Sequence, residues 1–320
     1  MHTVSIGIPT YNRPQFLRQA LESCRRQSYT DFEIIVSDDS TDDACEAVAS
    51  TFAEDNPSVS ITYARNMSRL GQAGNVNQLF RMAQGEFFVL LHDDDLFLES
   101  ALEHLVNAMK RRYPLPAVVY GKLLVINDGG LLMQDHTIKL NKAYSRSSEM
   151  VGLQQDALRA AILQQVPPDG YLIPTRLAQS VRYESEDVCG NACDADFMIR
   201  VARTGIEFYY FDEYVTAYRL SAESITTSGN LSSAYFRLLV RLADEPELRN
   251  SVNVAMTRVS ISALKEYALV NRRSDAWNIY WSQWYPWRRR LTLKGLYHMM
   301  FILWPRLAQL ILRSKNARIQ

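Results

Sequence analysis

The amino-acid sequence predicts an α/β fold with a doubly wound, mostly parallel sheet flanked by helices, followed by a helical C-terminal extension. Short β-branched runs alternate with amphipathic segments of helical period through the first 130 residues. Strands separated by helices need crossover connections, which produce a parallel sheet. From residue 231 to the end the apolar pattern is helical.

The first half contains five expected strands, each a short apolar or β-branched run. They cover residues 3–8, 32–36, 59–63, 86–91 and 117–120. The helices expected between them cover residues 14–24, 44–52, 73–84 and 98–112. Pro14 suits the first turn of the first helix, because the N–H that proline lacks has no partner within the helix at that position.

The second half has a looser pattern. The sequence NDGG at 127–130 predicts a hairpin turn, and VPPDG at 166–170 predicts a loop. A helix is expected over 191–204, followed by two strands over 206–211 and 214–219.

The composition excludes several classes of protein. The 320 residues are 47% hydrophobic, which excludes disorder as the main character and predicts one large domain or two. Basic and acidic residues are equal at 35 each, whereas a dedicated nucleic-acid binder would carry a basic surplus. Four cysteines are too few for a disulfide framework. The N-terminus lacks the regions of a signal peptide, which predicts a cytoplasmic protein.

The charge is unevenly distributed along the chain. Residues 271–320 carry a formal charge of +9 and all five tryptophans, and the first 270 residues carry −9. Trp277, Trp281 and Trp284 are spaced to share one helical face, and the apolar segment 295–312 is barely long enough to span a bilayer. We expect the tail to lie on an anionic membrane surface, which would place the protein on the inner face of the plasma membrane. Spanning the membrane, packing on the first domain and homo-oligomer contact are the alternatives.

Polar clusters follow the first, second and fourth expected strands. They are residues 9–12 (PTYN), 37–40 (SDDS) and 92–95 (HDDD). Ligands of open α/β sheets bind beyond the carboxyl ends of the strands. One such cluster alone is explained by helix capping or a solvated turn. Three at one edge of a sheet predict a ligand site.

The HDDD cluster predicts a metal site. Three consecutive carboxylates repel one another unless a cation neutralises them, and hard oxygen ligands select Mg²⁺ or Mn²⁺. The alternative is an acidic loop that caps the next helix, but capping needs only one carboxylate. Neither a P-loop nor a dinucleotide-binding fingerprint is present.

Six segments together resemble the family-2 inverting glycosyltransferases of the GT-A nucleotide-sugar fold, over about residues 3–228. The resemblance implies a GT-A catalytic domain over 1–230, with a nucleotide half (1–120) and an acceptor half (121–230), before the helical region 231–320. The segments are PTYNRP at 9–14, SDDSTDD at 37–43, RLGQAGNVN at 69–77, HDDD at 92–95, CDADFMIR at 193–200 and YRLSAESIT at 218–226.

The resemblance implies roles for individual residues. Asp95 and Asp93 would hold the Mn²⁺ or Mg²⁺ ion, with Asp95 the more direct ligand. Arg69 would lie near the phosphates, and Asp39 would read the base or ribose. The full set implied for nucleotide-sugar binding is Pro9, Thr10, Tyr11, Asn12, Asp39, Arg69, Asn75, Asp93 and Asp94.

Two carboxylates are implied for catalysis, Asp194 as the base and Asp196 as the residue that positions it. Inverting transfer needs the acceptor hydroxyl deprotonated as it attacks, so one carboxylate must face the acceptor. Two residues two positions apart on a helix point in different directions, so only one can be the base. The alternative is that Asp194 only caps the helix. Cys193 and Ser221 depart from the Glu and His common in the family, and His92 is a candidate substitute for that His.

The predicted function is metal-dependent inverting transfer of a sugar from a nucleotide diphosphate, most simply a UDP- or dTDP-sugar. The acceptor would be a glycan or lipid-linked glycan of bacterial surface polysaccharide synthesis. A nucleotidyltransferase is one alternative, although the Gly-rich basic loop that such an enzyme needs after the first strand is missing. A catalytically impaired nucleotide-sugar-binding protein is the other.

Overall fold

The structure is a computed structural model that describes residues 2–112, 114–220 and 230–306. The chain divides into two compact units. The first comprises residues 1–188 and 193–222, and the second comprises 189–192 and 223–320. The boundary expected at residue 230 stays a prediction.

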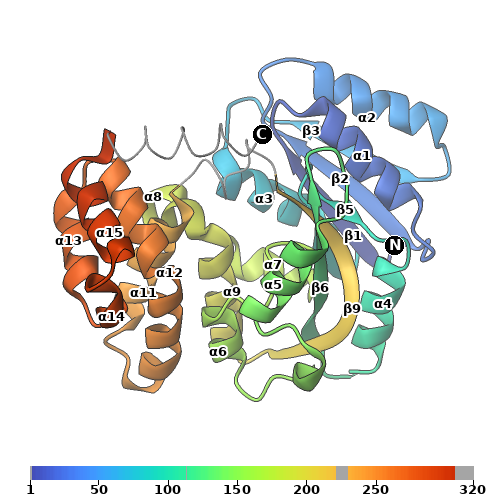
Figure 1. The fold of residues 1–320 in the computed structure, drawn as a ribbon. Helices are drawn as coiled ribbons and strands as arrows, with labels where there is room; N and C mark the ends of the chain where they lie inside the picture. Colours follow the sequence, from blue (N-terminus) through green and yellow to red (C-terminus); the bar gives the residue numbers. More distant parts are fainter. Residues whose placement is uncertain (1, 113, 221–229, 307–320) are drawn as a thin grey trace. The chain divides into compact units, whose positions relative to one another are not determined.

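A nine-stranded mixed sheet forms the centre of the first unit (Figure 1). Its order is β3-β2-β1-β4-β8-β6-β9-β5, and β7 pairs with β9. The neighbours β3, β2, β1 and β4 are all parallel, as are β6 and β9, which confirms the mostly parallel sheet. The strands are β1 (Val4–Thr10), β2 (Phe32–Asp38), β3 (Ser60–Arg65), β4 (Phe87–Leu90), β5 (Leu96–Phe97), β6 (Ala117–Asn127), β7 (Gly152–Leu153), β8 (Tyr171–Pro174) and β9 (Glu207–Leu220).

The sequence analysis missed β8, a strand of four residues that runs antiparallel to both β4 and β6. Its reversed direction puts its first residue at the edge where β4 ends. Gly170, in the loop just before β8, donates its N–H to the carbonyl of Leu90 at 2.8 Å. The predicted VPPDG loop therefore reaches the carboxyl edge of the parallel strands.

The two strands expected over 206–211 and 214–219 are one strand, β9. The polar pair Asp212 and Glu213 interrupts the apolar pattern, but the backbone continues beside β6 with two shifts of register. The chains approach closely at Gly121, where a Cβ atom would lie 2.4 Å from the carbonyl oxygen of Glu213. The hairpin turn at 127–130 is confirmed, since Gly130 N–H bonds Asn127 O at 2.9 Å.

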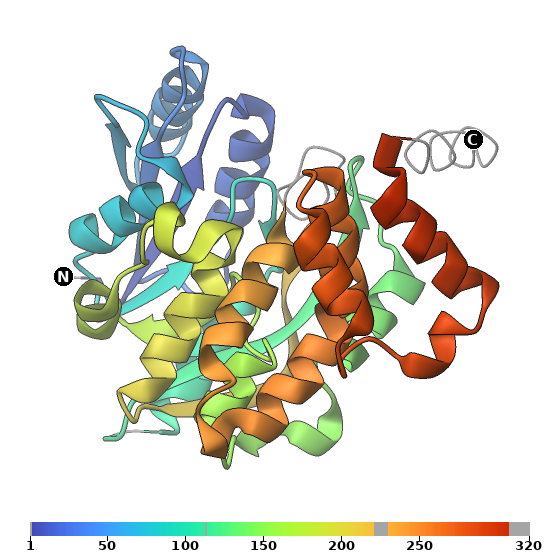
Figure 2. The ribbon, with the colours of Figure 1, turned by 90° about the vertical axis from the view of Figure 1, so that its left-hand side faces the viewer.

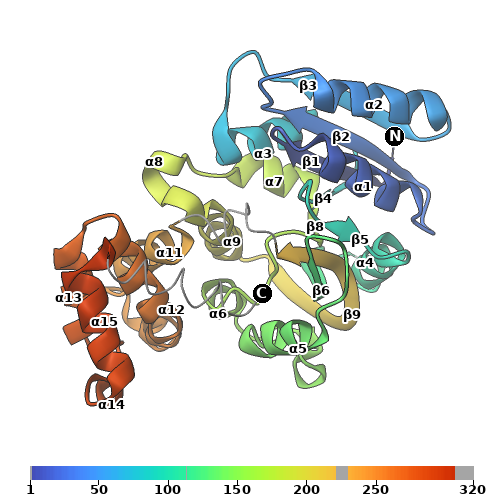
Figure 3. The same ribbon diagram turned by 45° about the horizontal axis from the view of Figure 1, so that its top comes forward.

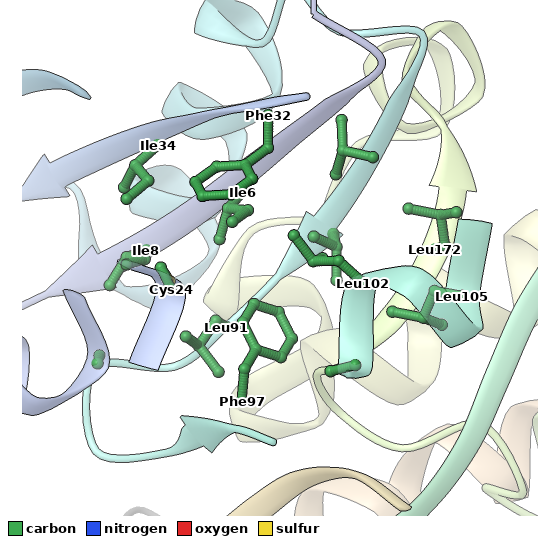
Figure 4. Close-up of a cluster of buried hydrophobic side chains, with 14 of the residues drawn as sticks. Ile6, Ile8, Cys24, Phe32, Ile34, Leu91, Phe97, Leu102, Leu105 and Leu172 are labelled. Carbon is green, nitrogen blue, oxygen red and sulfur yellow. The ribbon is translucent and has the colours of Figure 1, made fainter. Parts of the chain in front are cut away.

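Helices cover both faces of the sheet. Helices α1 (Pro14–Arg25), α2 (Ala44–Asp55) and α4 (Ala101–Lys110) pack on one face. Figure 4 shows this core, in which Ile6 and Ile34 of the sheet meet Cys24 of α1 and Leu102 of α4. The remaining helices of this unit are α3 (Gly71–Met82), α5 (Gln134–Ala143), α6 (Ala157–Ile162), α7 (Thr175–Val181), α8 (Glu186–Cys189) and α9 (Cys193–Arg203).

The other face of the sheet carries an aromatic cluster. Phe80 of α3 meets Phe88 of β4 edge-on at 4.9 Å between ring centroids and stacks on Phe197 of α9 at 5.5 Å. Gly7 in β1 has no room for a Cβ atom, which would lie 2.4 Å from the Phe88 ring. These contacts fix α3 and α9 against the strands that end at the polar clusters.

The second unit is helical, as expected. Helices α11 (Leu231–Leu242) and α12 (Arg249–Leu269) lie side by side (Figure 2), and Glu266 accepts the N–H of Ser233 at 2.7 Å. Helices α13 (Arg273–Trp281), α14 (Trp287–Arg290) and α15 (Leu293–Leu303) follow in the described part of the unit (Figure 3). No helix in the described ranges combines the length and apolar character needed to cross a bilayer.

The expected face of three tryptophans does not form. Helix α13 ends at Trp281, so Trp284 lies beyond it in the turn before Pro286. The Trp284 ring packs edge-on against Phe236, and its Nε1 donates to Asn253 Oδ1 at 2.8 Å. Trp284 is thus a packing residue of the second unit. The expected apolar segment 295–312 extends past the described residues, within which α15 ends at Leu303.

Candidate functional site

Three loops at the carboxyl ends of β1, β2 and β4 meet around Thr10. The Thr10 hydroxyl donates to Asp93 Oδ2 at 2.8 Å, which joins the first loop to the acidic one. The Thr10 carbonyl accepts the N–H of Asp39 at 3.0 Å and the side-chain amide of Asn75 at 3.3 Å. The parallel sheet therefore brings together residues that are far apart in the sequence.

Asn12 follows β1 in the left-handed backbone region, with φ 54°. Its N–H donates to Ser40 Oγ at 2.8 Å, and its Oδ1 accepts the N–H of Thr41 at 2.9 Å. These bonds fix the turn beside Tyr11, whose ring is partly exposed. The Arg69 guanidinium lies over that ring, 4.3 Å from its centroid. Tyr11 and Arg69 thus form a stacked pair at this end of the site.

The Asp39 carboxylate is buried and organises the loop that leads into α3. Its two oxygens accept the N–H of Leu70 at 3.1 Å each, and Oδ1 also accepts the side-chain amide of Asn66 at 2.8 Å. At the first turn of α3, Glu186 Oε1 accepts the N–H of Gln72 at 2.6 Å.

Arg13 bridges two of the three acidic side chains. Its Nη1 lies 3.4 Å from Asp93 Oδ1 and 2.9 Å from Asp94 Oδ2. Burial and the neighbouring Asp94 raise the pKa of Asp93 to about 6, while the Arg13 charge and the Thr10 hydroxyl oppose that rise. The guanidinium thus neutralises part of the charge that three adjacent carboxylates would otherwise concentrate here.

Asp95 and Asp169 carry buried carboxyl groups. Asp95 Oδ1 accepts the N–H of Arg219 at 2.7 Å, and Asp169 Oδ2 accepts the N–H of His92 at 3.3 Å. Within the described part of the chain, Asp95 Oδ2 and Asp169 Oδ1 accept no hydrogen bond from another residue. A proton on Asp95 would join the two carboxyl groups to each other. Burial, together with repulsion from Asp169 and Asp94, raises the pKa of Asp95 well above its ordinary value.

One ligand atom each from His92, Asp95 and Asp169 fall within 4.8 Å of one another, a spacing that could hold a metal ion. The Nδ1 atom of His92 lies 3.9 Å from Asp95 Oδ2. The sequence analysis expected Asp93 to share the ion with Asp95. In the structure Asp93 instead bonds Thr10 and Arg13, so its role as a ligand stays a prediction.

Arg219 holds the acidic loop, residues 92–95, in place through hydrogen bonds. Its side chain is fully buried, and its Nε donates to the carbonyl of Asp94 at 2.7 Å. One Nη donates to the carbonyl of Asp128 at 2.8 Å, and the other donates to Gln19 Oε1 at 2.8 Å. The guanidinium also lies 4.9 Å from the centroid of the Phe16 ring. Arg219 therefore ties β9 to the loop that presents Asp95.

Asp194 and Asp196 have different surroundings. Asp194 Oδ1 is buried and has no partner among the described residues, and burial raises the pKa of Asp194. Asp196 pairs with Arg200 at 2.7 Å, and Arg200 also donates to the carbonyls of Val181 and Arg182 at 2.7 Å each. Asp194 is the second residue of α9, and backbone N–H groups of Asp194 and Ala195 at the start of the helix act against the rise in its pKa. Its role as base or as a helix-capping residue therefore stays a prediction.

The two departures from the family pattern have different outcomes. Cys193, the first residue of α9, is fully buried. Ser221 lies outside the described residues. His92, the candidate substitute for a metal-contacting His, lies beside Asp95 and Asp169 and is close enough to Asp194 for its charge to favour the ionised carboxylate.

Three residues of the site were missed by the sequence analysis. Asp169 was part of a predicted loop, but nothing marked β8 as an antiparallel strand that brings this loop to the site. Arg13 belongs to the PTYNRP segment at the end of β1, and the only signal for its role was a basic residue at the same sheet edge as the triple carboxylate. Arg219 was quoted within YRLSAESIT, and no pattern in the sequence shows that it is buried.

The first unit is similar in sequence to known glycosyltransferases. Residues 5–159 match the model described as glycosyl transferase family 2. A Campylobacter jejuni protein named GalNAc(5)-diNAcBac-PP-undecaprenol beta-1,3-glucosyltransferase is 34% identical over 131 residues, which are 41% of each chain. An uncharacterized glycosyltransferase of Methanocaldococcus jannaschii is 22% identical over 68% of this chain and 70% of its own. The alignments thus cover less than half of the C. jejuni relative.

Solved structures share the fold. Residues 1–349 of S. aureus TarS, in complex with UDP-GlcNAc, match with a TM-score of 0.59 and 15% identity over 95% of this chain and 80% of that one. The mannosyltransferase PcManGT from Pyrobaculum calidifontis, in complex with GDP-Man and Mn²⁺, matches with a TM-score of 0.59 and 17% identity over 95% and 87%. These likenesses confirm the GT-A fold.

Proposed function

We propose that this chain, which carries a glycosyl transferase family 2 domain, transfers a sugar with inversion from a nucleotide diphosphate to an acceptor hydroxyl, and that the reaction depends on Mn²⁺ or Mg²⁺. The observation that carries the proposal is the set of buried carboxyl oxygens on Asp95, Asp169 and Asp194, which have no protein hydrogen-bond donor among the described residues. His92 lies close to all three carboxyl groups. A buried carboxylate is costly unless a ligand or a proton satisfies it.

The donor atoms present fit a divalent cation. Asp95 and Asp169 supply oxygen ligands, which suit Mn²⁺ and Mg²⁺, and His92 adds an imidazole nitrogen that Mn²⁺ accepts more readily than Mg²⁺. When bound, such an ion would support the negative charge of the departing diphosphate. Asp93 and Asp94, held by Arg13, would complete the acidic side of the donor site. PcManGT, with Mn²⁺ in its complex, shares this fold.

The nucleotide would bind at the Tyr11 end of the site. Tyr11 offers a partly exposed ring for the base, with Asn12 and Pro9 shaping the turn and Arg69 supplying positive charge. Asp39 and Asn75 would fix the ribose pocket by holding the loop before α3 and the Thr10 carbonyl. A UDP- or dTDP-sugar is the proposed donor, and the TarS complex with UDP-GlcNAc on this fold supports the class.

Asp194 would act as the base. Its carboxylate accepts the proton of the acceptor hydroxyl while the hydroxyl oxygen attacks the anomeric carbon. The bond from that carbon to the diphosphate oxygen breaks on the opposite face, so the configuration inverts. Burial raises the pKa of Asp194, which moves a carboxylate toward the pKa that suits a base at neutral pH. Asp196 would position it, because its bond to Arg200 anchors α9 to the end of α7.

The proposed acceptor is a glycan or lipid-linked glycan of bacterial surface polysaccharide synthesis. Support comes from the C. jejuni relative, whose name specifies an undecaprenol diphosphate-linked substrate. Such acceptors would place the chain in the cytoplasm at the inner face of the plasma membrane. The nucleotidyltransferase alternative is not favoured, since the relatives named by activity are glycosyltransferases.

The experiment is a donor panel with the purified full chain. Release of nucleoside diphosphate from UDP-, dTDP- and GDP-sugars would be measured with Mn²⁺, with Mg²⁺ and with EDTA. We expect the native chain to release nucleoside diphosphate from sugars of one nucleotide class, and EDTA to abolish that release. We expect Asp194→Asn to bind the same donor with greatly reduced turnover. Release of nucleoside monophosphate or pyrophosphate would indicate a nucleotidyltransferase. If the native chain bound a donor but did not turn it over, even when acceptor extracts were added, the protein would be a catalytically impaired nucleotide-sugar-binding protein.

A further inference from the structure

Helix α15 is apolar on both of its faces. The inward face carries Gly295, His298 and Ile302, all buried in the second unit. The outward face carries Leu293, Leu296 and Leu303 at spacings of three and seven, which is one side of an α-helix, and these are 85%, 51% and 36% exposed. A second row of apolar side chains on a helix is normally covered by another surface. The outward face therefore lacks a cover among the described residues.

The segment before α15 adds further exposed apolar side chains. Trp287 and Leu291 are 62% and 81% exposed, and Trp281 and Trp304 are similarly exposed on either side of them. We name these seven residues the apolar tail surface, and all lie in the second unit: Trp281, Trp287, Leu291, Leu293, Leu296, Leu303 and Trp304.

The backbone under this surface is firmly held. Arg290 donates to the carbonyl of Tyr280 at 2.9 Å and to that of Ser282 at 2.7 Å. Thr292 caps α15 by accepting the N–H of Gly295 at 3.3 Å. A Cβ atom at position 295 would lie 2.1 Å from the carbonyl of Arg289, so glycine allows α14 to pack directly on α15. The exposed side chains thus project from an ordered frame.

Along the chain, basic residues alternate with the residues of the apolar tail surface, and between Trp281 and Trp304 no acidic residue does. Arg288, Lys294 and Arg306 are exposed among its residues. In the sequence, no acidic residue follows Asp275, whereas eight lysines or arginines do. This combination matches a surface that is apolar inside and anionic at its boundary.

We propose that the apolar tail surface binds the headgroup region of an anionic lipid bilayer, with α15 lying in the plane of the membrane. Tryptophan rings favour the headgroup level, where Trp281, Trp287 and Trp304 would lie. The leucines of α15 would enter the acyl boundary, and the basic side chains would meet lipid phosphates. The proposal does not depend on the transfer reaction.

A second copy of the chain is the weaker candidate for the cover. A two-fold interface would place the same surface against itself, so the basic side chains of both copies would face each other without acids to pair with. Anionic lipid neutralises the same charges. The charge pattern therefore favours the membrane over a homodimer.

The test is co-sedimentation of the full chain with vesicles of phosphatidylcholine alone or mixed with phosphatidylglycerol. We expect binding to the mixed vesicles, weakened by salt, and little binding to phosphatidylcholine. The variant Leu293→Glu/Leu296→Glu should lose at least tenfold in binding, and Arg288→Gln/Lys294→Gln should lose about fivefold for each charge removed. Leu115→Glu, at an exposed leucine of the first unit, is the matched control and should bind as the native chain does.

Several results would overturn the proposal. Binding that is equal on both vesicle types, or absent at low salt, would exclude an anionic bilayer as the cover. Unchanged binding by both double variants would place the contact elsewhere. If light scattering showed a native dimer that Leu293→Glu/Leu296→Glu dissociates, a second copy would be the cover. Far-UV circular dichroism and thermal unfolding of every variant are the fold control, and neither depends on the proposed transfer reaction.

Discussion

Replacing Asp169 by Asn should have opposite effects on stability and on metal binding. Asp95 Oδ2 and Asp169 Oδ1 are buried and accept no hydrogen bond from another residue that the structure describes, and they belong to a cluster whose ligand atoms lie no more than 4.8 Å apart. Two unit charges at that spacing repel by about 3 kcal/mol at an effective dielectric constant of about 20. A proton shared with the raised-pKa Asp95 relieves part of this repulsion. The expected gain in the free energy of unfolding of the metal-free protein is therefore about 1–2 kcal/mol.

The same substitution removes one anionic oxygen from the proposed metal site. We expect Asp169→Asn to weaken Mn²⁺ binding by about 10- to 100-fold, the effect typical of a lost or disturbed ligand contact. Urea unfolding in EDTA would measure the stability, and calorimetric titration of Mn²⁺ in the presence of UDP would measure the affinity. Asp135→Asn, at an exposed position in the first turn of α5, is the matched control.

The reasoning would be refuted if Asp169→Asn changed the free energy of unfolding and the Mn²⁺ affinity in the same direction, or changed only one of them. If Asp169→Asn lowered both stability and Mn²⁺ affinity, the Asp169 carboxylate would be a structural hydrogen-bond acceptor, chiefly for the N–H of His92. If it raised stability and left Mn²⁺ affinity unchanged, the ion would bind elsewhere. Only a more stable variant with weaker metal binding agrees with a carboxylate kept at a cost for function.

Three further predictions concern the base, the acidic loop and the second unit. Asp194→Asn should keep donor affinity and lower turnover by roughly 10²–10⁴-fold, and near-native turnover in steady-state assays would place the base elsewhere. Arg219→Lys should lower the free energy of unfolding, measured by urea titration, by about 2–3 kcal/mol. The reason is that one ammonium group cannot make all the hydrogen bonds of the guanidinium to Asp94, Asp128 and Gln19. An unchanged midpoint of the urea titration would contradict the role of Arg219 in holding the acidic loop. Burial lowers the pKa of His298 from 6.5 to about 4, so the unfolded chain binds this proton more readily than the folded chain. The contribution of His298 to stability should therefore fall by about 2 kcal/mol from pH 7 to pH 5, measured by thermal unfolding as the difference between the native chain and His298→Gln. The raised pKa of Asp93 acts in the opposite direction but equally in both chains, and an identical pH dependence of the two chains would contradict the prediction.

Much of the fold follows from local sequence pattern. The strands β1 to β4 are apolar runs separated by amphipathic helices, so the alternation of strand and helix predicted that these strands run parallel to one another. The pattern failed at β8, where four residues after two prolines carry too little periodicity to mark a strand. It also failed in β9, because Asp212 and Glu213 are polar but the strand continues through register shifts made possible by Gly121.

The site was predicted as far as parallel topology dictates it. Thr10, Asp39 and Asp93 lie together because each follows a strand that ends at the same edge of the sheet. Asp169 reaches that edge at the start of an antiparallel strand, so its place depends on a pairing between distant segments that no local pattern encodes. Trp284 shows the converse, since regular helical spacing predicted one face of three tryptophans, whereas the chain turns after Trp281 and packs the partly buried Trp284 ring against Phe236.

The most direct test of the account is the position of Mn²⁺ in crystals of the full chain grown with UDP, located by anomalous scattering. The account predicts an anomalous peak between the oxygen of Asp95 and that of Asp169, with His92 beside it and the diphosphate completing the coordination. A peak held by Asp93 and Asp94 without Asp169, or UDP bound with no ion at the acidic loop, would contradict it.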